Sequence, residues 1–319
     1  MRTVDSVLRL IGNTPLVRLN RVTSGLEAEV WAKLEYLNPT GSTKDRVALR
    51  MIQDAERQGH LKPGYTIVES STGNTGTTLS FIGTLMGYKV IIYETTPGKM
   101  GPEKKNLMAG YGAEVRTISP EEYEDLSKGV PGAEIELHGR RICLALEKRS
   151  SNVWWARQFA NPSNVEAQKD AGREILEQTG GRVEAFVASI GTGGTLMGVA
   201  EVLKERNRKT RVVGAVPPGS KREMRPGKPY PKSEIEGGII SEMLMRPGLI
   251  DEVVTVTDGE AVEMIGRLWR EEGIFAGVSS GANVVAALRL AEGMKRDQKV
   301  VAVMHDSGDR YLTTRHYVT

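Results

Sequence analysis

Apolar positions along the chain follow two alternating patterns. Short apolar runs rich in β-branched residues predict strands, and apolar residues repeated every three or four positions predict helices. The strand pattern occurs at 16–19, 29–34, 66–69, 89–93, 114–118, 185–190, 211–216, 252–256 and 299–304. The helix pattern occurs at 46–55, in a segment that ends at 87, and at 102–111, 142–148, 166–177, 196–205, 259–272 and 280–294. Because strands and helices alternate, we predict an α/β protein whose parallel sheets are covered by helices on both faces.

Two segments interrupt the alternation. Between 120 and 140 charged residues, glycines and prolines replace the regular pattern, which predicts an insertion or a surface excursion. The segment 217–232 is a loop rich in proline, glycine, lysine and arginine. Since regular order returns after residues 154–155, the chain is predicted to form two α/β units that meet near 150–160.

Composition narrows the possible functions. The 319 residues include 43 lysines and arginines and 40 aspartates and glutamates, which are intermixed and leave a net charge of +3. We therefore expect no nucleic-acid partner. Cys143 is the single cysteine, so an internal disulfide is impossible and a reducing, cytoplasmic location is expected.

Membrane and metal functions have little support in the sequence. The N-terminal stretch lacks a long apolar segment, and no later apolar run is long enough to cross a bilayer, so we expect neither export nor a membrane partner. The four histidines are scattered without the spacing of zinc ligands, so no metal site is predicted; they are His60, His138, His305 and His316.

One lysine lies inside a turn. The segment 38–46 reads Asn-Pro-Thr-Gly-Ser-Thr-Lys-Asp-Arg, and its Asn-Pro and Gly-Ser pairs are typical of turns. Lys44 is therefore expected where a loop enters a helix, and the positive end of the helix dipole favours an uncharged amine there. An uncharged lysine can form a Schiff base, whereas the alternative is a solvated lysine in a first turn.

A second turn follows the predicted strand 66–69. It reads Ser71-Thr-Gly-Asn-Thr-Gly76, and its small residues, hydroxyls and amide suit a carboxylate-sized anion. The alternative is a structural turn in which serine and threonine cap a helix.

A third turn, Gly191-Thr-Gly-Gly-Thr195, follows another apolar strand and precedes a helix, as a phosphate-binding loop does. It lacks both the Gly-Lys-Ser/Thr ending of a P-loop and the glycine spacing of the dinucleotide fingerprint. A single phosphate on a compact cofactor fits this loop better than a nucleotide, so a nucleotide-binding dehydrogenase is disfavoured.

Two further segments offer polar groups. Gly277-Val-Ser-Ser-Gly-Ala-Asn283 lies at a predicted helix start, where Ser279 could meet a ring nitrogen or only cap the helix. Gln158-Phe-Ala-Asn-Pro162 offers an amide at the junction of the two units, or forms a plain loop. A serine or cysteine nucleophile is not predicted, because Ser279 and Ser307 lack the Gly-x-Ser-x-Gly setting and Cys143 falls in an amphipathic helix.

Together these motifs resemble the cysteine synthase/cystathionine β-synthase family of fold type II pyridoxal phosphate enzymes. The resemblance rests on the order and spacing of six segments and extends from Ile11-Gly-Asn-Thr-Pro-Leu to Tyr311-Leu. The segments begin at Asn38, Ser71, Gln158, Gly191, Gly277 and Ser307. One departure is that the family's Thr-Ser-Gly-Asn-Thr-Gly reads Ser71-Thr72-Gly73 here; since both hydroxyls are kept, we expect the carboxylate site to be kept too.

The resemblance implies roles for individual residues. Lys44 would hold pyridoxal 5′-phosphate covalently and act as the base at the substrate Cα. Asn74 would bind the 3′-oxygen of the cofactor, Ser279 would face its pyridine nitrogen, and its phosphate would be held by Gly191, Thr192, Gly193, Gly194 and Thr195. The substrate carboxylate would be bound by Ser71, Thr72, Thr75 and Gln158.

The resemblance also implies a fold and an activity. A smaller mobile lobe, 41–157, would close on a larger lobe, 1–40 plus 158–319, with the cofactor between two mostly parallel twisted sheets. The expected reaction is replacement of the activated hydroxyl of O-acetylserine or O-phosphoserine by sulfide, giving cysteine, in a homodimer. The alternative is the cystathionine β-synthase reaction of serine with homocysteine.

The loop 217–232 bears on which activated serine is used. Its basic residues could neutralise the phosphate of O-phosphoserine, or the loop could be only solvated. They are Lys221, Arg222, Arg225 and Lys228, and we place Arg222 and Arg225 among the candidate substrate-binding residues.

Overall fold

Two separate sheets organise the chain in the computed structural model, which describes residues 3–71, 73–94, 100–117, 119, 121, 137–218, 229–230, 238–239, 246–314 and 316. The larger sheet has six strands in the order β1 (Leu16–Arg18), β2 (Glu29–Leu34), β12 (Lys299–Met304), β7 (Ala185–Ser189), β8 (Arg211–Val216) and β11 (Glu252–Thr255). The smaller has four, in the order β5 (Glu114–Thr117), β4 (Lys89–Glu94), β3 (Thr66–Ser70) and β6 (Val153–Trp155). Every pairing in these sheets is parallel except that of β1 with β2, which confirms the predicted α/β class.

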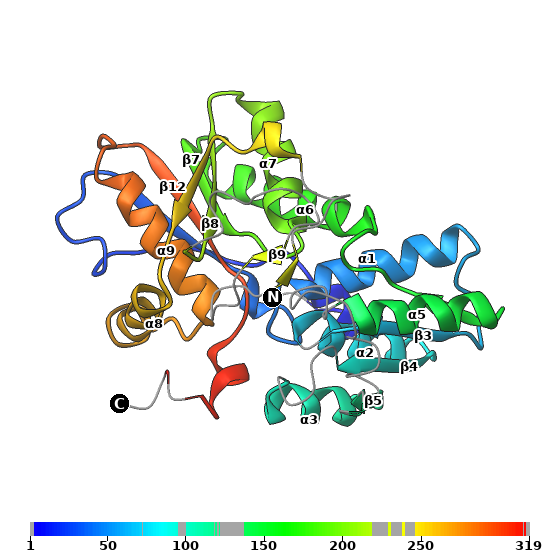
Figure 1. The fold of residues 1–319 in the computed structure, drawn as a ribbon. Coiled ribbons are helices and arrows are strands. Elements are labelled where there is room, and N and C mark those ends of the chain that lie inside the picture. The colour runs from blue at the N-terminus through cyan, green and yellow to red at the C-terminus, as the bar shows by residue number, and fades with distance from the viewer. Residues whose placement is uncertain are drawn as a thin grey trace.

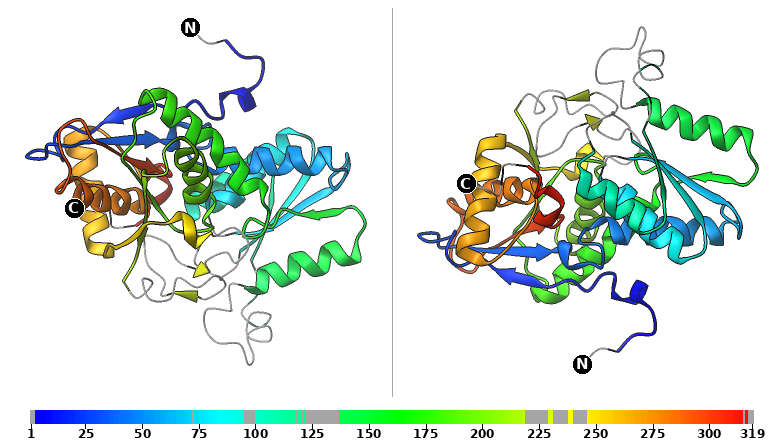
Figure 2. Two further views of the ribbon diagram at one scale, coloured as in Figure 1. Left: turned by 90° about the horizontal axis from the view of Figure 1, so that it is seen from above. Right: turned by 90° about the horizontal axis from the view of Figure 1, so that it is seen from below.

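Helices cover both faces of both sheets, and the two sheets occupy different halves of the molecule (Figures 1 and 2). The helices are α1 (Lys44–Arg57), α2 (Asn74–Leu85), α3 (Pro102–Gly110), α5 (Leu137–Arg149), α6 (Ser163–Gln178), α7 (Gly194–Arg206), α8 (Asp258–Arg267) and α9 (Val278–Ala291). Shorter turns of helix are η1 (Val7–Leu10), η2 (Glu35–Leu37), η4 (Pro247–Leu249), η5 (Leu268–Glu272) and η6 (Gly308–Tyr311), and β9 (Pro229–Tyr230) pairs with β10 (Gly238–Ile239).

The strand period of two explains how each sheet is covered. In β12, Val300, Ala302 and Met304 pack in one apolar cluster with α8 and α9, whereas Val301 and Val303 pack in another with α6 and α7. The four-stranded sheet is covered in the same way, by α1 and α2 on one face and by α5 on the other. The strands therefore end between helices, and their carboxyl ends lie where helices begin.

Several boundaries differ from the sequence prediction. The pair Trp154-Trp155, expected only to precede regular structure, belongs to β6 and pairs with Ile67 and Val68 of β3. Its run of three residues is too short for the strand pattern to be detected. The helix expected at 259–272 ends at Arg267 and continues as the π-helical turn η5. Most of the expected insertion at 120–140 and most of the loop 217–232 lie outside the described residues.

Four charged side chains, three of them buried and one partly exposed, join the two halves of the molecule. The Arg46 guanidinium of α1 donates to Glu35 at 2.7 and 2.8 Å and to Glu174 of α6 at 2.7 Å through two nitrogens. Lys33 of β2, which is fully buried, donates to Glu174 at 2.7 Å and to the Thr14 carbonyl at 2.7 Å. Two positive and two negative groups thus compensate one another through direct ion pairs, which fixes the start of α1 against β2 and α6.

This cluster makes stability depend on acid pH. Burial alone would raise the pKa of Glu174, but the hydrogen bonds and charges of Arg46 and Lys33 outweigh burial and lower the pKa from 4.5 to about 2. A folded pKa below the unfolded one stabilises the native state by about 3 kcal/mol above pH 4.5, and this contribution is lost as the pH falls toward 2.

We expect Glu174→Gln to lower the free energy of unfolding at pH 7 and to flatten its decrease between pH 5 and 3. Urea denaturation across this pH range measures both effects. Glu177→Gln, an exposed change on the same helix, is the matched control. Parallel pH profiles for the wild type and Glu174→Gln would show that Glu174 does not carry the pH dependence.

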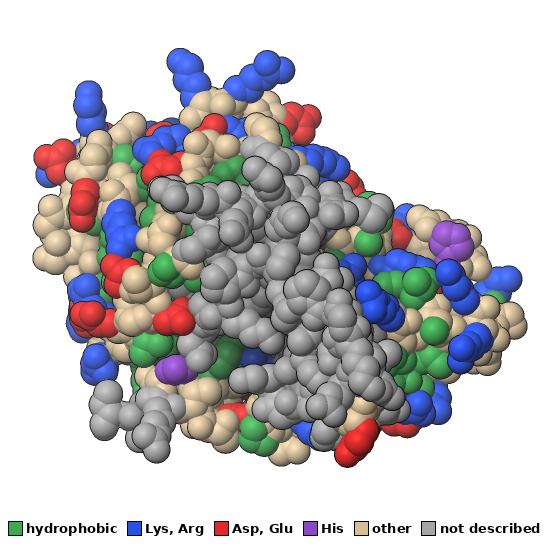
Figure 3. Space-filling model, viewed as in Figure 1, with side chains coloured by type: hydrophobic (Ala, Val, Ile, Leu, Met, Phe, Trp, Pro, Cys, Tyr) green, Lys and Arg blue, Asp and Glu red, His purple; other side chains and the backbone are tan. Residues whose placement is uncertain are grey.

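The surface agrees with the mixed charges of the sequence. On the face in Figure 3, acidic and basic side chains are interspersed along the described part of the larger-sheet half. No helix within the described ranges is long and apolar enough to cross a membrane. In the same part of the chain, no group of three or more His, Cys, Asp or Glu residues could hold a metal ion.

Candidate active site

Lys44 is the first residue of α1, as the turn chemistry predicts, and its side chain is half-buried. The preceding residue is fixed from two sides. The Thr43 N–H donates to the His305 carbonyl at 2.8 Å, and the Gln168 amide of α6 donates to the Thr43 hydroxyl at 3.1 Å. The lysine is thus held beside the carboxyl end of β12, at a helix N-terminus.

The turn after β3 is organised by the Ser71 hydroxyl. It accepts hydrogen bonds from the N–H groups of Gly73 at 3.2 Å and Gly76 at 3.1 Å. These bonds wrap the backbone around the start of α2, which begins at Asn74. Thr72 lies outside the described residues, so its predicted role is not tested.

Two candidate carboxylate-binding residues contact each other. The Thr75 hydroxyl donates to the Gln158 side-chain carbonyl at 2.6 Å, and the Gln158 amide donates to the Ser70 carbonyl at 3.1 Å. Both side chains are buried, although they come from segments 83 residues apart. The structure therefore brings the turn after β3 and the segment before α6 to one place.

The glycine-rich turn after β7 is held by Asn164. The Asn164 amide donates to the Gln158 carbonyl at 2.8 Å and to the Thr192 hydroxyl at 3.1 Å. Gly193 has φ +86°, which favours glycine, and a Cβ on Gly194 would lie 2.0 Å from Asn164 Oδ1. Glycine at both positions lets the loop take this shape without strain or a clash at the N-terminus of α7, and first-turn N–H groups there suit a phosphate.

The start of α9 reaches the same edge of the larger sheet. Ser279 is the second residue of α9 and is half-buried. The next residue, Ser280, accepts a hydrogen bond from the His305 N–H at 3.0 Å through its hydroxyl. His305 therefore lies between the lysine turn, through its carbonyl, and the start of α9, through its N–H.

Sequence reasoning missed His305 and Asp306. Burial, and then the charge of Lys44, lower the pKa of His305 from 6.5 to about 4, so its imidazole is neutral at pH 7. The Asp306 carboxylate accepts from the Asn74 amide at 2.7 Å and from the Tyr311 hydroxyl at 2.7 Å. Their position directly after the apolar strand 299–304 was the available signal, because the site turns 71–76 and 191–195 also follow strands.

Hydrogen bonds link all of these segments into one site. They lead from the lysine turn through His305 to α9 and, through the adjacent Asp306, to Asn74. From the next residue, Thr75, they continue through Gln158 and Asn164 to the glycine-rich turn. A half-buried lysine, a glycine-lined phosphate loop and neutral hydroxyls thus meet at the carboxyl ends of strands from both sheets, and this set of groups fits pyridoxal phosphate.

Comparison with known proteins decides the family. The model of the pyridoxal-phosphate dependent enzyme family matches residues 7–306. The chain belongs to the pyridoxal-phosphate dependent enzymes. A cysteine synthase of Staphylococcus aureus is 39% identical to this pyridoxal-phosphate dependent enzyme over 320 aligned positions, which cover 99% of the chain and 98% of that protein.

Solved structures agree with this assignment. A cysteine synthase from Entamoeba histolytica superposes with a TM-score of 0.88 at 33% identity, covering 100% of the chain and 92% of that structure. An O-ureido-L-serine synthase superposes with a TM-score of 0.86 at 34% identity, covering 99% and 95%. The fold and family predicted from the motifs of this pyridoxal-phosphate dependent enzyme are thereby confirmed.

The structure bears on the predicted exclusion of a cysteine nucleophile, but not on the two candidate arginines. Cys143 is fully buried in α5, and burial, followed by the charge of Glu69, raises the pKa of its thiol, which leaves it a poor nucleophile. The candidate basic residues Arg222 and Arg225 lie outside the described residues, so no contact of theirs is tested.

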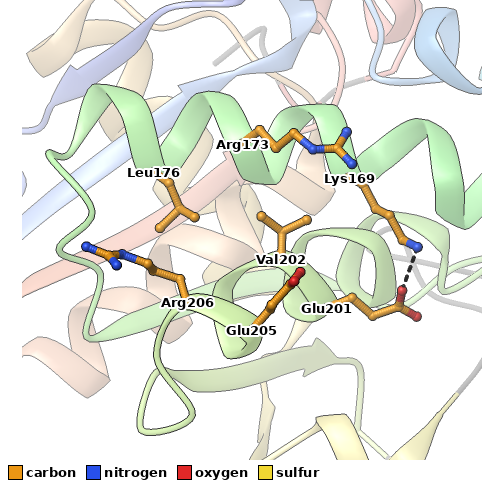
Figure 4. A pocket seen from close by; sticks show the side chains of 7 residues that line it. All are labelled: Lys169, Arg173, Leu176, Glu201, Val202, Glu205 and Arg206. Carbon is orange, nitrogen blue, oxygen red and sulfur yellow. Dashed lines mark ion pairs between the residues drawn. The ribbon is translucent and has the colours of Figure 1, made fainter.

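A surface groove elsewhere is not part of this site. It lies between α6 and α7, and an ion pair of 2.9 Å joins Lys169 to Glu201 across it (Figure 4). Its lining residues include none of the candidate site residues; they are Lys169, Arg173, Leu176, Glu201, Val202, Glu205 and Arg206.

The shape of the glycine-rich turn predicts a loss of cofactor binding in Gly194→Ala. The new methyl would displace Asn164, and with it the hydrogen bond that holds Thr192. We expect the dissociation constant for pyridoxal phosphate, measured by titrating the apo-protein, to rise about tenfold. Gly259→Ala is the control, because a Cβ at this exposed helical position has no neighbour within 4 Å. An unchanged dissociation constant in Gly194→Ala would remove this loop from the phosphate site.

Proposed function

We propose that this enzyme makes L-cysteine by replacing the activated hydroxyl of an O-activated L-serine with sulfide. The observation that carries the proposal is the hydrogen-bonded connection of Lys44, Asn74, the 191–195 turn and the start of α9 at the carboxyl ends of three strands. The names of the similar proteins, cysteine synthases from two organisms, point to the same reaction.

Each site segment has a task in this proposal. Lys44 holds the cofactor covalently and moves the proton at the substrate Cα, and the N–H groups of the 191–195 turn bind the phosphate. Asn74 donates to the 3′-oxygen of the cofactor. When bound, pyridoxal phosphate supplies an electron sink for cleavage at Cα and loss of the group on Cβ.

In this proposal Ser279 limits the chemistry because its side chain is a neutral hydroxyl and not a carboxylate. A hydroxyl opposite the pyridine nitrogen stabilises a protonated ring less than a carboxylate would. The ring is then a weaker electron sink, which disfavours transamination and leaves loss of a β-substituent as the favourable course.

The substrate carboxylate is assigned to Ser71, Thr72, Thr75 and Gln158. Supporting this, the Ser71 hydroxyl has two backbone donors and keeps its own proton to donate, while Thr75 and Gln158 are buried together at 2.6 Å. A carboxylate that binds here would accept the hydrogen bond that the Thr75 hydroxyl now donates to Gln158.

The two sheets are assigned to two lobes, 41–157 and 1–40 plus 158–319, with the cofactor between them. Closure of the smaller lobe on the substrate carboxylate would exclude water from the reacting atoms. We also propose that the enzyme is a cytoplasmic homodimer; the single buried cysteine supports a reducing compartment.

Substrate choice is tested by kcat/KM for O-acetylserine, O-phosphoserine and serine, each with sulfide or homocysteine. Cysteine formation from O-acetylserine or O-phosphoserine with sulfide supports the proposal. Activity confined to serine with homocysteine would replace it with the cystathionine reaction. If O-phosphoserine is used, Arg222→Ala and Arg225→Ala should raise its KM and leave that of O-acetylserine unchanged.

The similarity to O-ureido-L-serine synthase calls for a second nucleophile in this kinetic comparison. Its TM-score of 0.86 is close to the 0.88 of the cysteine synthase, so overall similarity does not separate the two reactions. Hydroxyurea is therefore included as a competing nucleophile, and we expect sulfide to be preferred. A higher kcat/KM with hydroxyurea would reassign the nucleophile and keep the rest of the mechanism.

A further inference from the structure

The side chain of Asn74 is held at both ends of its amide. Arg310 donates from Nη1 to Asn74 Oδ1 at 2.7 Å, and Asn74 Nδ2 donates to Asp306 Oδ2 at 2.7 Å. Both partners come from the segment that follows β12, more than 230 residues away from Asn74 in the chain.

The chemistry of the two partners allows only one orientation of this amide. A guanidinium has no acceptor, so it must face the amide oxygen, and an ionised carboxylate has no donor, so it must face the amide nitrogen. Rotating the amide by 180° would set oxygen against carboxylate and N–H against guanidinium. Asn74 is therefore locked, whereas an isolated asparagine could present either end.

The two partners are themselves fixed. Arg310 is 2% exposed and also donates to the Thr40 carbonyl in the turn that leads to Lys44. Asp306 is 1% exposed and accepts from Tyr311 at 2.7 Å. Gly277 leaves room for Asp306, because a Cβ there would lie 2.2 Å from its Oδ1.

One amide proton of Asn74 remains available after these contacts. Its nitrogen carries two N–H bonds, and among the described residues only the one to Asp306 is used. Because Arg310 occupies the amide oxygen, Asn74 offers a bound molecule a hydrogen-bond donor and not an acceptor.

We propose that Arg310 and Asp306 are positioning residues that orient the Asn74 amide so that its free N–H donates to the 3′-oxygen of pyridoxal phosphate. This inference deepens the proposed function and rests on the role given there to Asn74. Arg310 also donates to the Thr40 carbonyl in the turn before Lys44. The same arginine therefore positions both Asn74 and the turn that carries Lys44.

The test is a mutant cycle on cofactor binding. Apo-protein is titrated with pyridoxal phosphate, and both the dissociation constant and the absorption maximum of the bound cofactor are measured. We expect Asn74→Ala and Arg310→Met each to raise the dissociation constant about tenfold and to shift the absorption maximum in the same direction. The double variant should bind no more weakly than Asn74→Ala alone, because Arg310 acts through the amide.

Conservative variants keep the test decisive if Arg310→Met does not fold. Arg310→Lys keeps a cation and one donor, and Asp306→Asn keeps the size but can offer either end to the amide. Both should give intermediate shifts in the absorption maximum, and neither should add to Asn74→Ala. Thr313→Val is the matched control, since Thr313 joins the same segment to Glu103 of α3 without touching Asn74.

The outcomes separate this inference from the proposed function. Multiplicative effects of Arg310 and Asn74 replacements would overturn the inference, as would a wild-type spectrum in Arg310→Met or in Asn74→Ala. A wild-type protein that binds no pyridoxal phosphate would instead overturn the proposed function itself.

Discussion

Replacement of Lys44 by alanine is expected to lower kcat about a thousandfold or more. The amine lies at the first position of α1, held by the bonds from Thr43 to His305 and from Gln168 to Thr43. In the proposed function it both holds the cofactor and moves the proton at Cα, and loss of a positioned general base alone costs about 10² to 10⁴ in rate. The measurement is cysteine formation from the better activated serine at saturating sulfide and pyridoxal phosphate.

Lys62→Ala provides the control, because Lys62 is exposed in the turn between α1 and β3. Its rate should equal that of the wild type. A Lys44→Ala protein that folds, as judged by circular dichroism, and retains more than about a tenth of the wild-type rate would place the base elsewhere.

Arg46→Met is expected to cause the largest loss of stability, about 3 to 5 kcal/mol in the free energy of unfolding. It removes the cation that compensates Glu35, which is 1% exposed, and one of the two that compensate Glu174. Burial alone would raise the pKa of Glu35, and the charge and hydrogen bonds of Arg46 reverse this and keep the carboxylate ionised. Urea denaturation at pH 7 measures the change.

A matched control lies one turn further along the same helix. Arg50 pairs with Asp54 at 2.9 Å with 38% of its side chain exposed, so Arg50→Met should cost less than about 1 kcal/mol. Adding Glu35→Gln to Arg46→Met should recover part of the loss, because it removes one of the uncompensated charges. Equal losses for Arg46→Met and Arg50→Met would contradict the role given to the buried cluster.

Local patterns in the sequence predicted those parts of the site that are built from turns. Lys44 and Asn74 are in first turns of helices, and the 191–195 turn follows a strand, as their glycine and hydroxyl content indicated. These features depend on neighbours in the chain, so they can be read from a short window.

Partners distant in the chain could not be predicted in this way. Asp306 and Arg310, which follow β12 of the larger sheet, reach Asn74, which follows β3 of the smaller sheet, across more than 230 residues, and Asn164 of α6 reaches Thr192 across 28. Such contacts between separate sheets and helices leave no signal in a short window of sequence. The buried group of Lys33, Glu35, Arg46 and Glu174 was missed for the same reason, since each residue alone has the composition of an ordinary surface position.

Peptide mapping tests most directly whether Lys44 forms a covalent bond with pyridoxal phosphate. The holoenzyme is reduced with borohydride, digested and analysed by mass spectrometry for the pyridoxyl-phosphate modification. We predict the modification on the peptide that contains Lys44, and its absence from that position in Lys44→Ala. Modification of a different lysine in the wild type, or of none, would contradict the account.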